Sequence, residues 1–176
     1  VPEEMRRGED FCAAGEAILE FNKRIIDAVC DVVPAVKVQV AYYEMYSVEG
    51  MKAFLETLKY AKEKGLIVIA DCKRNDIGAT AACYANAYIG KTDMPDGAQA
   101  AFGADIATIN PYLGVDGVKP FADACRENGT GVFVLIVISC LGTLNGLMLS
   151  NCRSFYAIAA RGQGPRPEML DKVDPA

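Results

Sequence analysis

Three charged residues at close spacing follow a short apolar segment in the middle of the chain. Asp71, Lys73 and Asp76 come after residues 67–70, an apolar run that is typical of a strand buried on both faces. Because side chains on a strand alternate between its two faces, Asp71 and Lys73 project to the same side and Cys72 to the other. Asp76 follows in a turn before an Ala-rich helix. We therefore expect the Lys73 ammonium to lie between two carboxylates.

A lysine between carboxylates can perform acid–base chemistry. Neighbouring anions favour the charged form of a lysine, so its ammonium is available to stabilise negative charge and to donate a proton. A second apolar strand pattern, at 34–44, carries another cation, Lys37. A solvated row of ion pairs at strand ends is the alternative interpretation of an isolated pair of this kind. Two lysine-bearing strands beside a group of carboxylates instead favour a functional site.

The composition excludes several kinds of catalytic site. The chain has no histidine, which removes Ser-His-Asp and Cys-His nucleophiles and histidine-containing zinc sites. Its seven cysteines are widely spaced, without a C-x-x-C pair, and their odd number is typical of a reducing cytosol. We interpret Cys72 as a small packing residue. Lysine and carboxylate side chains must then supply any acid–base chemistry.

The charge and hydropathy patterns indicate a soluble protein that does not bind nucleic acid. The net charge is -5, whereas a nucleic-acid-binding domain carries a basic patch. The longest apolar run, at 131–141, is shorter than the roughly 20 residues that cross a bilayer. We therefore expect a cytoplasmic location and no membrane contact. An anionic substrate would have to be captured by a local cluster of cations.

Apolar periodicity predicts an alternation of strands and helices. We expect helices at 10–30, 47–64, 79–90, 115–127 and 144–160, and strands at 35–42, 66–72, 105–109 and 131–138. Ser47 is expected to cap the second of these helices. Such an alternation forms a parallel sheet with right-handed crossovers. Because charged groups at the carboxyl ends of strands are typical of a (β/α)8 barrel, the predicted fold class is α/β, of the TIM-barrel kind.

The length allows only part of such a barrel. A complete barrel needs about 250 residues, whereas this chain has 176 and shows about four to five β/α units. We expect a partial barrel domain at 1–160 and a flexible tail at 161–176, where prolines and charges replace core-forming periodicity. A piece of a longer enzyme is the preferred interpretation, because the charged cluster is complete while whole strands are missing.

Several segments resemble one enzyme family, in matching order along the chain. Residues 71–80 are similar to the active-site signature of the orotidine 5'-phosphate decarboxylase family, and the flanking blocks lie at 21–23, 35–39, 43–44, 108–114 and 132–135 with Ser139. The likeness is closest to the bacterial long-form branch and covers residues 17–158. A lone D-x-K-x-x-D also occurs in sister sugar-phosphate synthases and decarboxylases, and the flanking blocks favour the orotidylate enzyme.

The resemblance implies the decarboxylation of orotidine 5'-phosphate to UMP, a step of pyrimidine biosynthesis. Lys73 would be the proton donor, flanked by Asp71, with Lys37 and Asp76 completing an alternating tetrad. The reaction requires no metal and no organic cofactor, because the charge that stabilises the carbanion comes from the lysine.

The resemblance also implies a homodimer. In the family, the aspartate that matches Asp76 reaches the partner's site together with the neighbours that match Ile77 and Thr80. Ser139 matches a serine that hydrogen-bonds the pyrimidine ring. The residues around Ser139 depart from the family pattern, and the family's ribose and phosphate blocks have no match in this chain.

Two other interpretations stay open. A sister sugar-phosphate decarboxylase or synthase would share the D-x-K-x-x-D motif and depend on magnesium. A truncated, catalytically silent interaction module would account for the missing phosphate blocks and would bind no UMP-like ligand.

Overall fold

Four parallel strands form a single sheet in the order β1-β2-β3-β4. The computed structural model describes residues 1–6 and 8–135, within the unit Val1–Leu135. The strands are β1 (Ala35–Gln39), β2 (Ile67–Arg74), β3 (Ile106–Ile109) and β4 (Gly131–Val134). Sequential parallel strands that lie next to one another come from repeated β/α units, so the predicted α/β class is confirmed.

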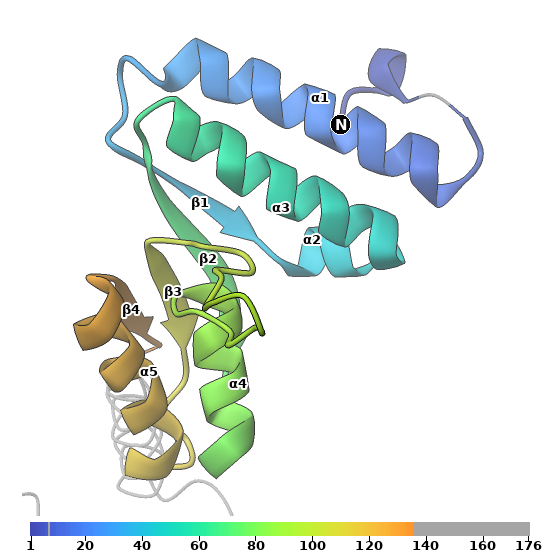
Figure 1. Cartoon of the computed structure of the whole chain (residues 1–176). Coiled ribbons are helices and arrows are strands. Elements are labelled where there is room, and N and C mark those ends of the chain that lie inside the picture. Colours follow the sequence, from blue (N-terminus) through green and yellow to red (C-terminus); the bar gives the residue numbers. More distant parts are fainter. Residues whose placement is uncertain (7, 136–176) are drawn as a thin grey trace, which may run out of the picture. The chain divides into compact units, whose positions relative to one another are not determined.

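Helices occupy the connections between the strands. They are the short 3-10 helix η1 (Glu3–Met5) and the helices α1 (Phe11–Val29), α2 (Ala41–Glu44), α3 (Ser47–Glu63), α4 (Gly78–Tyr88) and α5 (Val115–Asn128). Figure 1 shows α1 and α3 side by side next to β1, and α4 and α5 next to the later strands. The helix predicted at 144–160 and the tail predicted at 161–176 lie outside the described residues.

Alternation along β2 separates the helix-covered core from the charged residues. Val68, Ala70 and Cys72 belong to the buried core, whereas Asp71 and Lys73 project from the opposite face of the strand. In the pairing register of β1 with β2, Lys37 lies opposite Ile69 and Gln39 opposite Asp71. Register partners on parallel strands point to the same side, so the sheet itself brings Lys37 onto the face of Asp71.

Local signals set most helix ends. The Asp10 carboxylate accepts a hydrogen bond from the Ala13 N–H (2.8 Å) and caps α1. Gly129, with a φ of 68°, ends α5 in the left-handed conformation. The prediction that Ser47 caps α3 is wrong. Tyr46 takes the cap position because α2 leads directly into α3, and Ser47 is the first helical residue, with a φ of 56°.

The carboxyl ends of the two strands that carry the charged residues differ from the predicted ones. β4 ends at Val134, and residues 136–138 of the strand predicted at 131–138 lie outside the described residues. The strand predicted at 35–42 ends at Gln39, because Val40 already has helical dihedrals and takes the N-cap position of α2, which begins at Ala41. β2 continues to Arg74, which pairs with Ile109 beyond a register shift against β3. Asp71 and Lys73 therefore lie within the irregular final part of β2 and not after the end of the strand.

Candidate active site

The buried Asp71 carboxylate lies between two lysine ammonium groups. Lys73 Nζ is 2.6 Å from Asp71 Oδ1, and Lys37 Nζ is 3.0 Å from Asp71 Oδ2. The Asp71 side chain is 4% exposed, whereas those of Lys73 and Lys37 are 45% and 58% exposed. The carboxylate thus holds two cations whose remaining N–H groups are accessible.

Within a single chain, the charged groups of this cluster alternate in a different order from the predicted one. The sequence predicted Lys73 between Asp71 and Asp76. Among the described residues Asp76 forms no ion pair, and its Oδ1 accepts a hydrogen bond from the N–H of Ile77 (2.9 Å). The structure therefore brings together Lys37, Asp71 and Lys73, and a role for Asp76 in another subunit stays a prediction.

Thr108 on β3 is a fourth member of the cluster, which sequence reasoning missed. Its hydroxyl donates to Asp71 Oδ1 (2.8 Å) and accepts the backbone N–H of Lys73 (2.9 Å). Thr108 is 4% exposed. Its signals in the sequence are a single hydroxyl in the otherwise apolar strand Ile106–Ile109 and its place at the start of the family-like block at 108–114, and neither assigns it to the carboxylate.

Hydrogen bonding outweighs burial at Asp71. Burial raises the pKa of its carboxyl, but hydrogen bonds from Lys73, Lys37 and Thr108 lower it from 3.8 to about 2. Asp71 is therefore ionised at neutral pH, which leaves one positive charge in excess among the two lysines and this carboxylate. In a chain of net charge -5, that excess is a local attraction for an anion.

The backbone of Lys73 is unusual. Its φ is 48°, in the left-handed region that non-glycine residues rarely adopt. The pairing of β2 with β3 changes register between Ala70 and Arg74, so this residue lies within an irregular part of the ladder. The conformation aims the Lys73 side chain back at Asp71, two residues earlier.

Arg74 fixes the end of β2 to the neighbouring helices. Its guanidinium donates to Glu44 at the end of α2 and to Tyr88 Oη at the end of α4 (2.9 Å). It also lies over the ring of Tyr84, 5.4 Å from the ring centre. These contacts hold the strand end that carries Lys73 from two sides.

The predicted site residues Asp76 and Ile77 lie in the loop between β2 and α4, and Thr80 lies in the first turn of α4. This loop packs closely on α5, because a Cβ added at Gly117 would lie 2.9 Å from Asn75 Oδ1 and 2.9 Å from the carbonyl oxygen of Asp76. Ile77 is 58% exposed, and Thr80 is also exposed. Ser139, predicted to contact the pyrimidine, lies outside the described residues.

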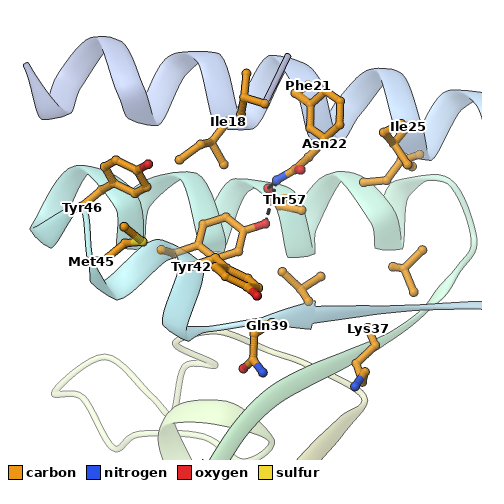
Figure 2. Close-up of a pocket in the computed structure, with 15 residues that line it drawn as sticks. Ile18, Phe21, Asn22, Ile25, Lys37, Gln39, Tyr42, Met45, Tyr46 and Thr57 are labelled. Atoms are coloured by element: carbon orange, nitrogen blue, oxygen red, sulfur yellow. Dashed lines mark hydrogen bonds between the residues drawn. The ribbon is translucent and has the colours of Figure 1, made fainter. Parts of the chain in front are cut away.

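A mostly apolar pocket of about 590 Å³ lies beside β1, and Lys37 is the one member of the charged cluster among its lining residues. Its walls come from α1 and α2, with Ile18, Phe21, Ile25, Tyr42, Met45 and Tyr46 among the lining residues. Figure 2 shows Lys37 and Gln39 on the side of β1 that faces away from α1. Asp71 and Lys73 do not line this pocket, so its volume does not mark the charged site.

Cys72 packs as the sequence predicted. It is 5% exposed and belongs to the core, and its thiol donates to the carbonyl oxygen of Thr108 (3.5 Å). Burial raises the pKa of the Cys72 thiol to about 11, which keeps it protonated and unreactive at neutral pH.

The described part of the chain contains neither a candidate metal site nor a helix that could span a membrane. Within residues 1–6 and 8–135, no three His, Cys, Asp or Glu side chains are grouped so that they could hold a metal ion. No helix of the same ranges combines the length and the apolar character needed to span a bilayer.

Comparison with known proteins identifies the family. The sequence pattern of the family described as orotidine 5'-phosphate decarboxylase / HUMPS matches residues 10–161. The chain belongs to this family. The sheet described above is therefore part of the family's TIM barrel, which confirms the predicted partial barrel.

Relatives and solved structures agree with this assignment. The chain is 43% identical over 132 residues to the orotidine 5'-phosphate decarboxylase of Clostridium acetobutylicum, and 46% identical over 122 residues to that of Caldicellulosiruptor saccharolyticus. These matches cover 73% and 69% of the chain, but 43% and 40% of the relatives. The OMP decarboxylase structure from Leishmania donovani matches with a TM-score of 0.55 at 28% identity, over 74% of this chain and 45% of that one. The chain spans less than half the length of these relatives.

Proposed function

We propose that this chain is part of an enzyme that decarboxylates orotidine 5'-phosphate to UMP in the cytoplasm. The observation that carries the proposal is the contact of 2.6 Å between the accessible Lys73 ammonium and the buried Asp71 carboxylate. Lys37 and Thr108 hold the same carboxylate. Family membership and the decarboxylase names of both bacterial relatives support this assignment.

In the proposed reaction, Lys73 supplies both charge stabilisation and a proton. The bond between C6 of the pyrimidine and the carboxylate carbon breaks, the electron pair stays on C6, and carbon dioxide leaves. The Lys73 ammonium stabilises the developing negative charge and transfers one proton to C6, after which the neutral amine regains a proton from solvent. Atoms and charges balance without an oxidant, a reductant or a metal.

The other members of the cluster keep this ammonium in position. Asp71 is ionised and buried, so it holds Lys73 Nζ at a fixed point on the open face of the sheet. Lys37 occupies the other carboxylate oxygen and adds a second cation within reach of an anionic substrate. The excess positive charge suits a substrate that carries a carboxylate and a phosphate.

We also propose that the enzyme is a homodimer whose subunits share their sites. Asp76 would complete the tetrad of the other subunit, with Ile77 and Thr80 beside it, and Ser139 would bind the pyrimidine. The exposure of Ile77 and Thr80, and the lack of an ion pair at Asp76 in the described part of the chain, support this arrangement.

Mixed dimers test the sharing directly. Lys73→Ala and Asp76→Ala chains are each expected to be inactive, and a mixture should regain activity because one of its two sites carries both native residues. No recovery in dimers verified to be mixed would contradict shared sites.

The activity itself is tested by following the conversion of orotidine 5'-phosphate to UMP and by titrating the 176-residue chain with UMP. Turnover supports the full proposal. UMP binding without turnover supports a substrate site that is incomplete, because the longer relatives contain segments that this chain does not match. A folded chain that does neither would be the silent interaction module, and the enzyme assignment would be wrong.

The family description also names HUMPS, which keeps the sister sugar-phosphate chemistry as a second candidate. The two differ in their metal requirement, because the sister enzymes depend on magnesium. Turnover of orotidine 5'-phosphate that is unchanged by EDTA would exclude the sister chemistry for this chain.

A further inference from the structure

We propose that Thr108 is a positioning residue whose hydroxyl locks the Asp71 carboxylate and the Lys73 backbone into one geometry. The role of Thr108 in catalysis rests on the proposed function, whereas its positioning of Asp71 and Lys73 is a property of the folded chain alone. Within the described residues, the Thr108 hydroxyl hydrogen-bonds to the Asp71 carboxylate and to the Lys73 N–H and to neither lysine ammonium group, so it acts through Asp71 and through the main chain of Lys73.

The hydroxyl closes a ring of hydrogen bonds. The Lys73 N–H donates to Thr108 Oγ1 (2.9 Å), Thr108 Oγ1 donates to Asp71 Oδ1 (2.8 Å), and Lys73 Nζ returns to the same Oδ1 (2.6 Å). Each member of such a ring restrains the next, and polar groups in series strengthen one another in a buried setting. The ring ties both ends of Lys73, its amide and its ammonium, to one carboxylate oxygen.

The amide of Lys73 needs this acceptor because of the local strand geometry. β2 and β3 change register between Ala70 and Arg74, and Lys73 has a φ of 48°, so its N–H is turned out of the regular ladder. The hydrogen bond of this N–H to the buried Thr108 hydroxyl is partly buried, and a backbone donor that is shielded from water without a partner is costly. The Thr108 side chain replaces the missing backbone acceptor and so stabilises the left-handed conformation.

The carboxylate needs the hydroxyl for its orientation. Both lysines reach Asp71 through long side chains that are about half exposed, and such side chains tolerate many directions. Thr108 is buried and lies on the adjacent strand, so it is the rigid partner of the three. It determines which oxygen of Asp71 faces Lys73.

Valine and serine substitutions separate the hydroxyl from the shape of the side chain. Thr108→Val keeps the volume and removes the hydroxyl, Thr108→Ser keeps the hydroxyl, and Thr57→Val is a matched control at a buried threonine of α3. The readouts are the titration of the Asp71 carboxyl carbon by NMR and amide hydrogen exchange at Lys73, both in the 176-residue chain.

For Thr108→Val we expect the pKa of Asp71 to rise from about 2 towards its ordinary value of 3.8, and the Lys73 amide to exchange about tenfold faster. Thr108→Ser and Thr57→Val should leave both values as in the native chain. If the valine variant does not fold, Thr108→Ala serves as the hydroxyl-free variant.

Two results would overturn the inference. One is a folded hydroxyl-free variant with a native Asp71 titration and a native Lys73 amide. The other is a serine variant that changes as much as the valine variant, which would assign the effect to the methyl group.

Neither readout depends on turnover, so this inference and the proposed function can fail separately. A native chain without UMP binding or activity, but with the expected responses to Thr108→Val, would remove the proposed function alone. In a preparation that turns over, Thr108→Val should lower kcat about tenfold with little change in KM, because Thr108 touches no substrate in the proposed mechanism.

Discussion

Two buried threonine hydroxyls serve networks of opposite character. Thr108 joins charged groups, since it donates to the Asp71 carboxylate between Lys37 and Lys73. Thr57, on α3, joins neutral groups: Asn22 Nδ2 donates to Thr57 Oγ1 (3.1 Å) and to Tyr43 Oη (2.7 Å). We call the first the charged cluster and the second the neutral network.

The apolar pocket and the charged cluster share only Lys37. The neutral network lies at the pocket of about 590 Å³, where Asn22, Tyr43 and Thr57 hydrogen-bond to one another within the protein. Asp71, Lys73 and Thr108 do not line that pocket, and the charged cluster presents accessible ammonium groups on a buried anion. An arrangement of fixed charge, and not a cavity, therefore marks the candidate active site.

The largest expected effect is on turnover and tests whether the chemistry belongs to the charged cluster. Lys73→Ala should lower kcat by at least about 1,000-fold, because the proton donor and the stabilising charge are both lost. The free energy of unfolding should change by less than about 1 kcal/mol, since the lysine is half exposed. Tyr43→Phe in the neutral network is the control and should keep turnover. A loss of folding that parallels the loss of activity in Lys73→Ala would contradict the assignment.

Acid should weaken the charged cluster and spare the neutral network. The pKa of Asp71 is lowered from 3.8 to about 2, so its stabilisation is complete above the unfolded value and is lost as pH falls through the folded one. We expect a loss of about 2 kcal/mol in unfolding free energy between about pH 5 and pH 2. Urea unfolding at several pH values measures it. Asp71→Asn should lack this component, and an identical acid dependence in that variant would refute it.

Alkali should act on the neutral network instead. Burial raises the pKa of Tyr43 above 10.0, against the lowering effect of its hydrogen bonds to Thr57 and Asn22. Because the pKa of Tyr43 is raised in the folded chain, the stabilisation from its protonated hydroxyl is present below pH 10.0 and declines as pH rises beyond it. Tyr43→Phe should cost about 1 kcal/mol at neutral pH through the lost hydrogen bond. It should also flatten the alkaline decline, and thermal unfolding at pH 7 and above pH 10 checks both.

The smallest effect concerns the two non-glycine residues that are left-handed in the described part of the chain, one in each region. Ser47, with a φ of 56°, begins α3 on the side of the neutral network, and Lys73, with a φ of 48°, belongs to the charged cluster. Ser47→Gly should raise the free energy of unfolding by about 1 kcal/mol, because glycine adopts this conformation without strain. Urea unfolding measures the change, and a destabilised Ser47→Gly variant would show that Ser47 is not strained.

The sequence predicted the parts of the site that depend on one strand or on regular pairing. Alternation placed Asp71 and Lys73 on one face and Cys72 on the other, and this is confirmed. Lys37 was predicted from a second strand, and the regular register of β1 with β2 brings it to Asp71.

Features that depend on irregular or non-local geometry were not predictable in this way. The contact of Thr108 with the Lys73 amide depends on the register change between Ala70 and Arg74, and no local pattern in β2 or β3 signals such a shift. The Ser47 cap failed for a similar reason, because α2 and α3 follow one another almost without a loop. Roles that need a second subunit, such as that of Asp76, lie beyond any single chain.

The anchoring of Arg74 limits how Asp76 can travel. Arg74 is bound to Glu44 and Tyr88, and α4 begins at Gly78, so only residues 75–77 connect the two fixed points. The four Cα–Cα steps from Arg74 to Gly78 reach at most about 14 Å when fully extended. Asp76 therefore lies in a short connection to α4, and any docking that displaces α4 moves the Asp76 carboxylate with it.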